Sequence, residues 1–273
     1  MSERKVAHSG PTLVLKRLAM MSALGLTLVA SAQTAQQVVD VPTRNGVTQR
    51  VLFLSPPEPK AMFLLFPGGH GGLGIFPNGS LRWGEGNFLV RSRQLFVDQG
   101  VAVAVVDAPS DRQSPPYLGG FRQTPEHAAD IKALIAWARE RSKVPVWLVG
   151  TSRGTQSAAF VATELHGSEG PDGVVLSSSI LRDPRGRPVP AMPLETIRVP
   201  VLVVHHEQDG CALCSFGDVA SLTSKVTNSP RTQLLQFKGG ENRGDPCEAF
   251  AYHGFNGLES EVVRQTVSWV LAR

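Results

Sequence analysis

A glycine–serine–glycine turn between an apolar run and a helical segment constrains this chain more than any other stretch. Residues 144–149 are almost wholly apolar and predict a buried strand. The sequence G-T-S-R-G follows at residues 150–154, and residues 155–165 predict a helix. In that setting G-x-S-x-G indicates a nucleophile elbow, a turn so tight that the serine is held in strained backbone geometry. The pattern alone also occurs in ordinary turns, so the assignment of Ser152 depends on the rest of the chain.

Strand and helix patterns alternate along most of the remaining sequence. The segments that predict strands are residues 36–41, 50–54, 61–66, 101–107, 144–149, 174–178, 199–205 and 232–237. Those that predict helices are residues 87–99, 125–142, 155–165, 216–226 and 257–271. This alternation favours an α/β fold with a mostly parallel, twisted sheet of the eight-stranded type and helices on both faces.

The chain length sets the number of domains. Its 273 residues suffice for one large α/β domain with a substantial core. We expect residues 33–273 to form that single domain, since no segment has room for a separate cap. Residues 181–198 are irregular and contain four prolines, so they are the candidate for a short lid loop.

The N-terminal segment has the pattern of a secretory signal peptide. Lys16 and Arg17 precede an apolar run at residues 18–30, and Ala30-Ser31-Ala32 supplies an A-x-A cleavage site. We therefore expect residues 1–32 to be removed and the protein to be exported, to the periplasm or the medium. The alternative is a retained N-terminal anchor, although the run is short for a membrane span and no later stretch approaches spanning length.

The predicted signal peptide also accounts for most of the net charge. The whole chain is +4, and residues 1–32 hold four basic side chains against Glu3, so the mature part is close to neutral. No basic face for nucleic acid is implied. We expect a small-molecule partner, and the sequence says nothing about oligomeric state.

Two loops after later strands carry the residue types that a serine nucleophile needs. A serine hydroxyl is a weak nucleophile, so it requires a base, and the base requires a partner that fixes its tautomer. Asp209 follows the strand predicted at residues 199–205, and His253 lies between the last strand and the last helix. In a parallel sheet such loops meet at the carboxyl edge. Glu207 and Asp183 are alternative acids.

The order Ser152, Asp209, His253, with its strand–elbow–helix setting, resembles the α/β-hydrolase superfamily over nearly the whole mature chain. The resemblance implies that Ser152 is the nucleophile, His253 the general base and Asp209 its orienting carboxylate. It also implies an oxyanion hole formed by the backbone N–H of Arg153 and that of Gly69 or His70.

The resemblance implies acyl transfer from a carboxylic ester to water through an acyl-enzyme, without a cofactor. A peptidase or amidase on the same fold is the nearest alternative. A binding protein that kept the scaffold and lost the chemistry is the alternative of a different class. Arg153, directly after the serine, departs from the family pattern. Three alternatives are open for its long side chain: it extends to solvent, it pairs with an acidic neighbour, or it binds a substrate carboxylate.

Other residue clusters suggest ligands less strongly. The glycine-rich loop at residues 67–74 lacks the G-K-[ST] and the spacing of phosphate-binding loops. His70, His205 and His206 suggest a metal site, but neighbouring residues of a strand point to opposite faces, so His205 and His206 do not readily share an ion. We therefore expect no metal, and one of these two histidines in the core.

Three cysteines in an exported protein suggest a disulfide and one free thiol. Cys211 follows the predicted acid by two residues, and Cys247 precedes the predicted base by six. If those two loops are neighbours, a Cys211–Cys247 bridge would join them. A Cys214–Cys247 bridge is the alternative, because connectivity does not follow from sequence.

Overall fold

The chain forms one mixed sheet of eight strands, seen in a computed structural model that describes residues 1–4, 6–7, 10 and 35–272. The order across the sheet is β1-β2-β4-β3-β5-β6-β7-β8. The strands are β1 Gln37–Pro42, β2 Thr48–Leu54, β3 Ala61–Phe66, β4 Val101–Pro109, β5 Val146–Thr151, β6 Gly173–Ser177, β7 Val201–His206 and β8 Thr232–Phe237. Strand β2 is antiparallel to both of its neighbours, and the strands from β4 to β8 are mutually parallel. The predicted α/β architecture is confirmed.

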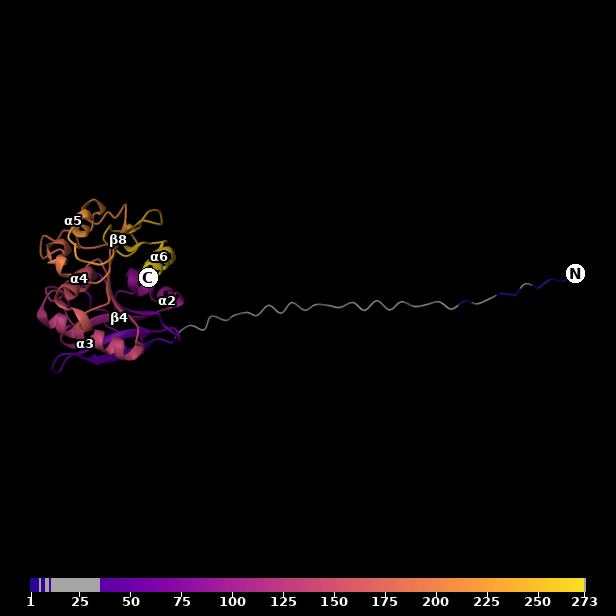
Figure 1. The fold of residues 1–273 in the computed structure, drawn as a ribbon, viewed down its shortest axis with the longest axis horizontal. Helices are drawn as coiled ribbons and strands as arrows, with labels where there is room; N and C mark the ends of the chain where they lie inside the picture. The colour runs from indigo at the N-terminus through magenta and orange to yellow at the C-terminus, as the bar shows by residue number, and fades with distance from the viewer. Residues whose placement is uncertain (5, 8–9, 11–34, 273) are drawn as a thin grey trace. The chain divides into compact units, whose positions relative to one another are not determined.

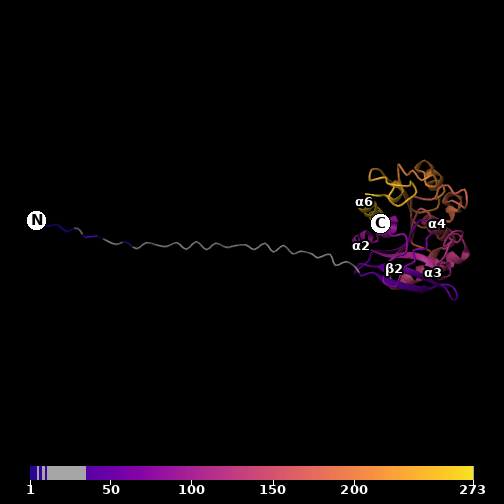
Figure 2. The ribbon, with the colours of Figure 1, turned by 180° about the vertical axis from the view of Figure 1, so that it is seen from behind.

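Helices cover both faces of this sheet. The helices are α1 Phe88–Arg91, α2 Arg93–Asp98, α3 Pro125–Ser142, α4 Gly154–Glu164, α5 Ala220–Thr223 and α6 Glu259–Leu271. Within residues 35–272, α3 and α4 lie on one side of the sheet and α2 and α6 on the other (Figures 1 and 2).

The apolar strands supply both cores because their side chains alternate between the two faces. In β3, Leu64 packs into the core under α3 and α4, whereas Phe63 and Leu65 pack into the core under α2 and α6. Every residue of β3 is buried, as expected for a strand covered on both faces. This double covering leaves the carboxyl ends of the strands as the place where polar loops converge.

Two predicted helices are shorter in the structure. The helix expected over residues 87–99 is interrupted at Ser92, whose backbone lies at φ −90° and ψ 0°, outside the helical region. The helix expected over residues 216–226 is a 3₁₀ turn, Phe216–Asp218, followed by the single turn of α5. Gly217 together with Ser221, Thr223 and Ser224 gives this segment low helix propensity.

The predicted lid segment, residues 181–198, is partly built into the core. Its only regular structure is two 3₁₀ turns, Val189–Ala191 and Leu194–Thr196, and Val189 and Leu194 are fully buried. Residues 184–187 are exposed, and residues 185–187 line a cavity together with Gly69 and Arg153.

The predicted signal peptide lies mostly outside the described residues, so its apolar run and cleavage site remain a prediction. Among the residues described, no helix has the length and apolarity needed to cross a bilayer.

Candidate active site

Ser152 sits in a turn that its neighbouring glycines make possible. Strand β5 ends at Thr151 and α4 begins at Gly154, which leaves two residues for the reversal. A Cβ atom on Gly154 would collide with the carbonyl oxygen of Phe66 in β3, and one on Gly150 would collide with that of Gly154. Ser152 itself has φ +53°, a left-handed conformation that costs free energy in a non-glycine residue. The geometry is that expected of a nucleophile elbow.

Neighbouring strands fix this strained turn in place. The backbone N–H of Ser152 donates to the carbonyl oxygen of Ser177, at the end of β6, over 3.0 Å. The hydroxyl of Thr155 donates to the carbonyl oxygen of Ser152 over 2.6 Å. Ser152 is half-buried, so its side chain is held at the carboxyl edge of the sheet with access to solvent.

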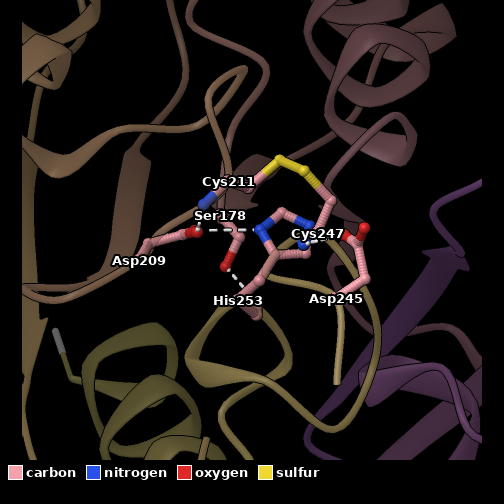
Figure 3. Close-up of a disulfide and its surroundings, with 6 residues drawn as sticks. All are labelled: Ser178, Asp209, Cys211, Asp245, Cys247 and His253. Atoms are coloured by element: carbon pink, nitrogen blue, oxygen red, sulfur yellow. Dashed lines mark hydrogen bonds and ion pairs between the residues drawn. A yellow bond between two sulfur atoms is a disulfide. The ribbon is translucent and has the colours of Figure 1, made fainter. Parts of the chain in front are cut away.

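The loop after β7 and the turn before α6 bring Asp209 and His253 together. The Nδ1 atom of His253 lies 2.9 Å from Oδ2 of Asp209, and both side chains are almost fully buried (Figure 3). The other carboxylate oxygen accepts the backbone N–H of Cys211 over 2.9 Å. With Asp209 accepting at Nδ1, the imidazole carries its proton there and its Nε2 has a free lone pair.

Ser152 and His253 face one cavity. Both line a hollow of about 460 Å³ whose walls also include glycines 68, 69, 84 and 86, the aromatic residues Trp83, Phe88 and Phe250, and the charged residues Arg243, Asp245 and Glu248. The Nε2 atom of His253 is buried and has no hydrogen-bond partner among the described residues. Ser152 Oγ makes no hydrogen bond to it in the described part of the chain, an arrangement frequent in unliganded hydrolases.

A disulfide joins the loop that carries Asp209 to the loop that carries His253. It links Cys211 with Cys247, the favoured of the two predicted pairings (Figure 3). Cys214 is free and buried, and burial raises the pKa of its thiol. The bridge closes a loop across a sequence separation of 36 residues, which restricts the unfolded chain.

Ser178 provides a second restraint on His253. It follows β6, has φ +44°, and its hydroxyl donates to the carbonyl oxygen of His253 over 2.7 Å (Figure 3). Its place directly after a buried strand was visible in the sequence, but the partner 75 residues away was not.

One backbone amide of the glycine-rich loop after β3 and one of the turn itself lie close to Ser152. A Cβ atom on Gly68 would lie 2.9 Å from the Cβ of Ser152, so the loop passes against the serine. The N–H groups of Gly69 and Arg153 have no acceptor among the described residues. Unsatisfied amides beside a serine hydroxyl are able to bind an oxyanion.

Asp107, near the end of β4, holds the far end of this loop. Its carboxylate accepts the backbone N–H groups of Leu73 over 2.7 Å, of Gly74 over 3.2 Å and of Ile75 over 2.9 Å. Sequence reasoning assigned Asp107 only to a strand. Its place directly after an apolar run was visible in the sequence, but its partners 32 to 34 residues away were not.

His70 is packed between aromatic rings. Its ring centroid lies 4.0 Å from that of Trp83 and 4.3 Å from that of Tyr117. Its Nδ1 accepts the N–H of Gly72, and burial followed by the charge of Arg122 lowers its pKa. The imidazole therefore shapes the loop, and any contribution to an oxyanion hole would come from the backbone.

His205 and His206 contact different neighbours, and both are fully buried, whereas only one of them was expected in the core. Nε2 of His205 accepts the N–H of Ser179 over 2.8 Å, and burial lowers the pKa of His205 to about 4. His206 stacks on Tyr252 with an angle of 7° between the rings.

One group of potential metal ligands occurs among the described residues, formed by Cys211, Cys214 and His253. Cys211 already forms a disulfide with Cys247, and Nδ1 of His253 is already hydrogen-bonded to Asp209. This group therefore does not offer three free ligand atoms.

The side chain of Arg153 pairs with an acid. Its Nη1 lies 3.0 Å from Oδ2 of Asp183, whose side chain is nearly buried. Asp183 therefore forms an ion pair with Arg153, and Asp209 is the carboxylate that is hydrogen-bonded to His253.

Comparisons with known proteins identify structural relatives only. No protein-family model matches the chain, and no curated protein matches its sequence. Two solved structures with similar folds are a dienelactone hydrolase from Anabaena variabilis (14% identity, TM-score 0.60, 88% of this chain and 98% of that one) and an esterase from Pyrococcus furiosus (13%, 0.62, 91% and 95%). A third is a serine hydrolase without a lid from Xanthomonas campestris (14%, 0.54, 86% and 95%). At such identities the likeness shows a shared fold.

Proposed function

The chain has the α/β-hydrolase fold, and from that premise we propose that it is an exported serine hydrolase that cleaves carboxylic esters. One observation carries the proposal. The hydrogen bond from His253 to Asp209 leaves Nε2 free at the wall of a cavity that also holds Ser152. A base with a fixed tautomer beside a strained, accessible serine is the arrangement that acyl transfer requires.

In the proposed first half-reaction, Ser152 Oγ attacks the ester carbonyl carbon while its proton passes to Nε2 of His253. The carbonyl oxygen becomes an oxyanion beside the N–H groups of Arg153 and Gly69, each of which contributes about 3 kcal/mol to transition-state stabilisation. The bond from carbon to the alcohol oxygen then breaks, and Nε2 returns the proton to that oxygen. Asp209 stabilises the imidazolium and keeps its own charge.

In the second half-reaction, water attacks the acyl group on Ser152 and gives its proton to Nε2. The bond to Oγ breaks, the proton returns to Oγ, and the carboxylic acid leaves. Amides and peptides would use the same groups with a poorer leaving group, so ester preference is part of the proposal.

A fluorophosphonate probe tests the serine. We expect stoichiometric labelling of the wild type and none of Ser152→Ala, while Ser168→Ala, an exposed serine remote from the cavity, labels normally. Hydrolysis of short p-nitrophenyl esters measured beside a peptide panel separates esterase from peptidase. A folded wild-type protein that neither labels nor hydrolyses any ester would contradict the enzyme and favour a binding protein.

Export is supported by the predicted signal peptide and by the disulfide, which persists in oxidising compartments. N-terminal sequencing of protein from the periplasm or medium tests it. We expect a chain that begins at Gln33, and an unprocessed N-terminus in the membrane fraction would instead indicate an anchor.

A further inference from the structure

A second cavity adjoins the candidate active site on the other side of the glycine-rich loop. Its volume is about 520 Å³, and Gly69 belongs to its wall as well as to that of the first cavity. Its charged lining consists of Arg122, Arg153, Arg185, Arg187 and Asp183. Four guanidinium groups against one carboxylate give the cavity an excess of positive charge, although the mature chain as a whole is nearly neutral.

Arg122 lies in the inner wall and has no acidic partner among the described residues. Arg122 is 5% exposed, and it forms no ion pair with any described residue. It donates to Ser157 Oγ over 2.9 Å and to the carbonyl oxygens of Pro67 and Gly69 over 3.2 and 3.4 Å. These acceptors are neutral, so they leave the charge uncompensated. A buried cation without a counterion is costly, and an entering anion would relieve that cost.

The electrostatics of Arg122 agree with this geometry. Burial, followed by the charge of Arg153, lowers the pKa of Arg122 to about 9. At neutral pH the guanidinium therefore keeps its charge, and its donors remain suited to a planar, bidentate anion such as a carboxylate.

Asp183 does not neutralise the cavity. It lies 3.0 Å from Arg153 and also accepts hydrogen bonds from Gln156 and from the N–H of Arg185. Its single charge is thus balanced by Arg153. Arg185 and Arg187 are exposed and form no ion pair among the described residues. They stand where they would attract an anion toward Arg122.

We propose that this arginine-lined cavity binds an anionic group of the substrate, a carboxylate carried by the ester on either its acyl or its alcohol part. The inference rests on the proposed function, because it takes Gly69 and Arg153 as the border between the reacting carbonyl and the anion subsite. It deepens that function by giving the substrate class: esters that bear a second, ionised carboxyl group.

The test compares ester pairs that differ only in that charge. On the alcohol side the pair is 4-acetoxybenzoate and 4-acetoxybenzamide; on the acyl side it is monomethyl adipate and the corresponding carboxamide. We expect kcat/KM to favour the carboxylate by about tenfold or more in one of the two pairs, mostly through KM. The pair that shows the preference identifies which part of the ester enters the cavity.

Two variants locate the preference. In Arg185→Gln/Arg187→Gln the KM of the preferred carboxylate ester should rise by about tenfold while that of its carboxamide stays unchanged. Arg198→Gln removes an exposed arginine outside the cavity and should leave both values unchanged. Arg122 is not used for this purpose, because its replacement would also release the glycine-rich loop.

The outcomes separate this inference from the proposed function. Equal kcat/KM within both pairs, in an enzyme that still labels at Ser152, would overturn the anion subsite and leave the esterase. A carboxylate preference that the double variant retains in full would overturn its assignment to this cavity. Absence of both labelling and ester hydrolysis would overturn the proposed function itself.

Discussion

The two halves of the candidate site are held by different means. Ser152 and the glycine-rich loop are positioned by backbone packing, since Gly154 fits against β3 and the N–H of Ser152 is bonded to β6. Asp209 and His253 come from long loops and are positioned by side-chain bonds and a covalent bridge.

The comparison shows which half depends on its surroundings. The turn around Ser152 is encoded within a few residues and is braced by the buried sheet, so single side-chain changes there should leave its geometry intact. The half that holds Asp209 and His253, the proposed acid–base half, is assembled across the chain, so loss of one long-range link should loosen it. The predictions below probe this difference, from the largest expected effect to the smallest.

Replacement of Ser152, the proposed nucleophile, should abolish turnover without loosening the fold. For Ser152→Ala we expect kcat/KM for a p-nitrophenyl ester to fall by about a millionfold, because no hydroxyl remains to accept the acyl group. The kcat/KM of His253→Ala should fall by several orders of magnitude as well. Urea unfolding should show near wild-type stability for the serine variant, and near-normal turnover in either one would contradict its assigned role.

Replacement of Asp209, the proposed orienting acid, should weaken the proposed base His253 without removing it. In Asp209→Asn the imidazole loses the carboxylate that selects its tautomer, and we expect kcat to fall by about ten-thousandfold with KM little changed. The matched control is Asp183→Asn, which changes an acid paired with Arg153 rather than with His253. Equal losses in the two variants would mean that Asp209 has no special relation to the base.

Loss of the disulfide should destabilise the acid–base half. The bridge closes a loop over 36 residues of separation, so Cys247→Ser should lower the free energy of unfolding by about 4 kcal/mol. Reductant should have a similar effect on the wild type, measured by urea unfolding. Cys214→Ala serves as the control, since it should leave the sensitivity to reductant intact. Equal stability of the wild type with and without reductant would contradict the prediction that the disulfide stabilises the fold.

Acid should instead probe the half that carries the serine. His127 in α3 packs against Phe121 and against Phe66, the last residue of β3, and burial lowers its pKa to about 3 from 6.5. Between these values the unfolded chain binds a proton that the folded chain does not, so the free energy of unfolding falls as pH falls. From pH 7 to pH 4 this one histidine should cost about 3 kcal/mol.

His127→Phe should flatten that acid dependence. The measurement is urea unfolding at a series of pH values, each normalised to pH 7. The buried His205 remains in the variant, so part of the acid loss persists. If the slope of the free energy of unfolding against pH were unchanged in the variant between pH 6.5 and pH 4, His127 would be accessible to protons in the folded state.

The same contrast explains what could be predicted from the sequence. The strands and the elbow were predictable because apolar runs and G-x-S-x-G are local patterns, and all eight strands form close to their expected bounds. The hydrogen bonds of Ser178, Asp107 and Arg122 were not predictable, because each depends on a partner 32 or more residues away. The arginine cavity was hidden for the same reason, since its lining comes from four separate loops and helices.

The central claim is that Ser152 carries the acyl group, and quenched-flow mass spectrometry during hydrolysis of a slow ester tests it most directly. The account predicts an adduct with the mass of the acyl group on the peptide that contains Ser152, absent when that serine is replaced by alanine. Steady ester hydrolysis with no adduct on that peptide, or with the acyl group on another residue, would contradict it.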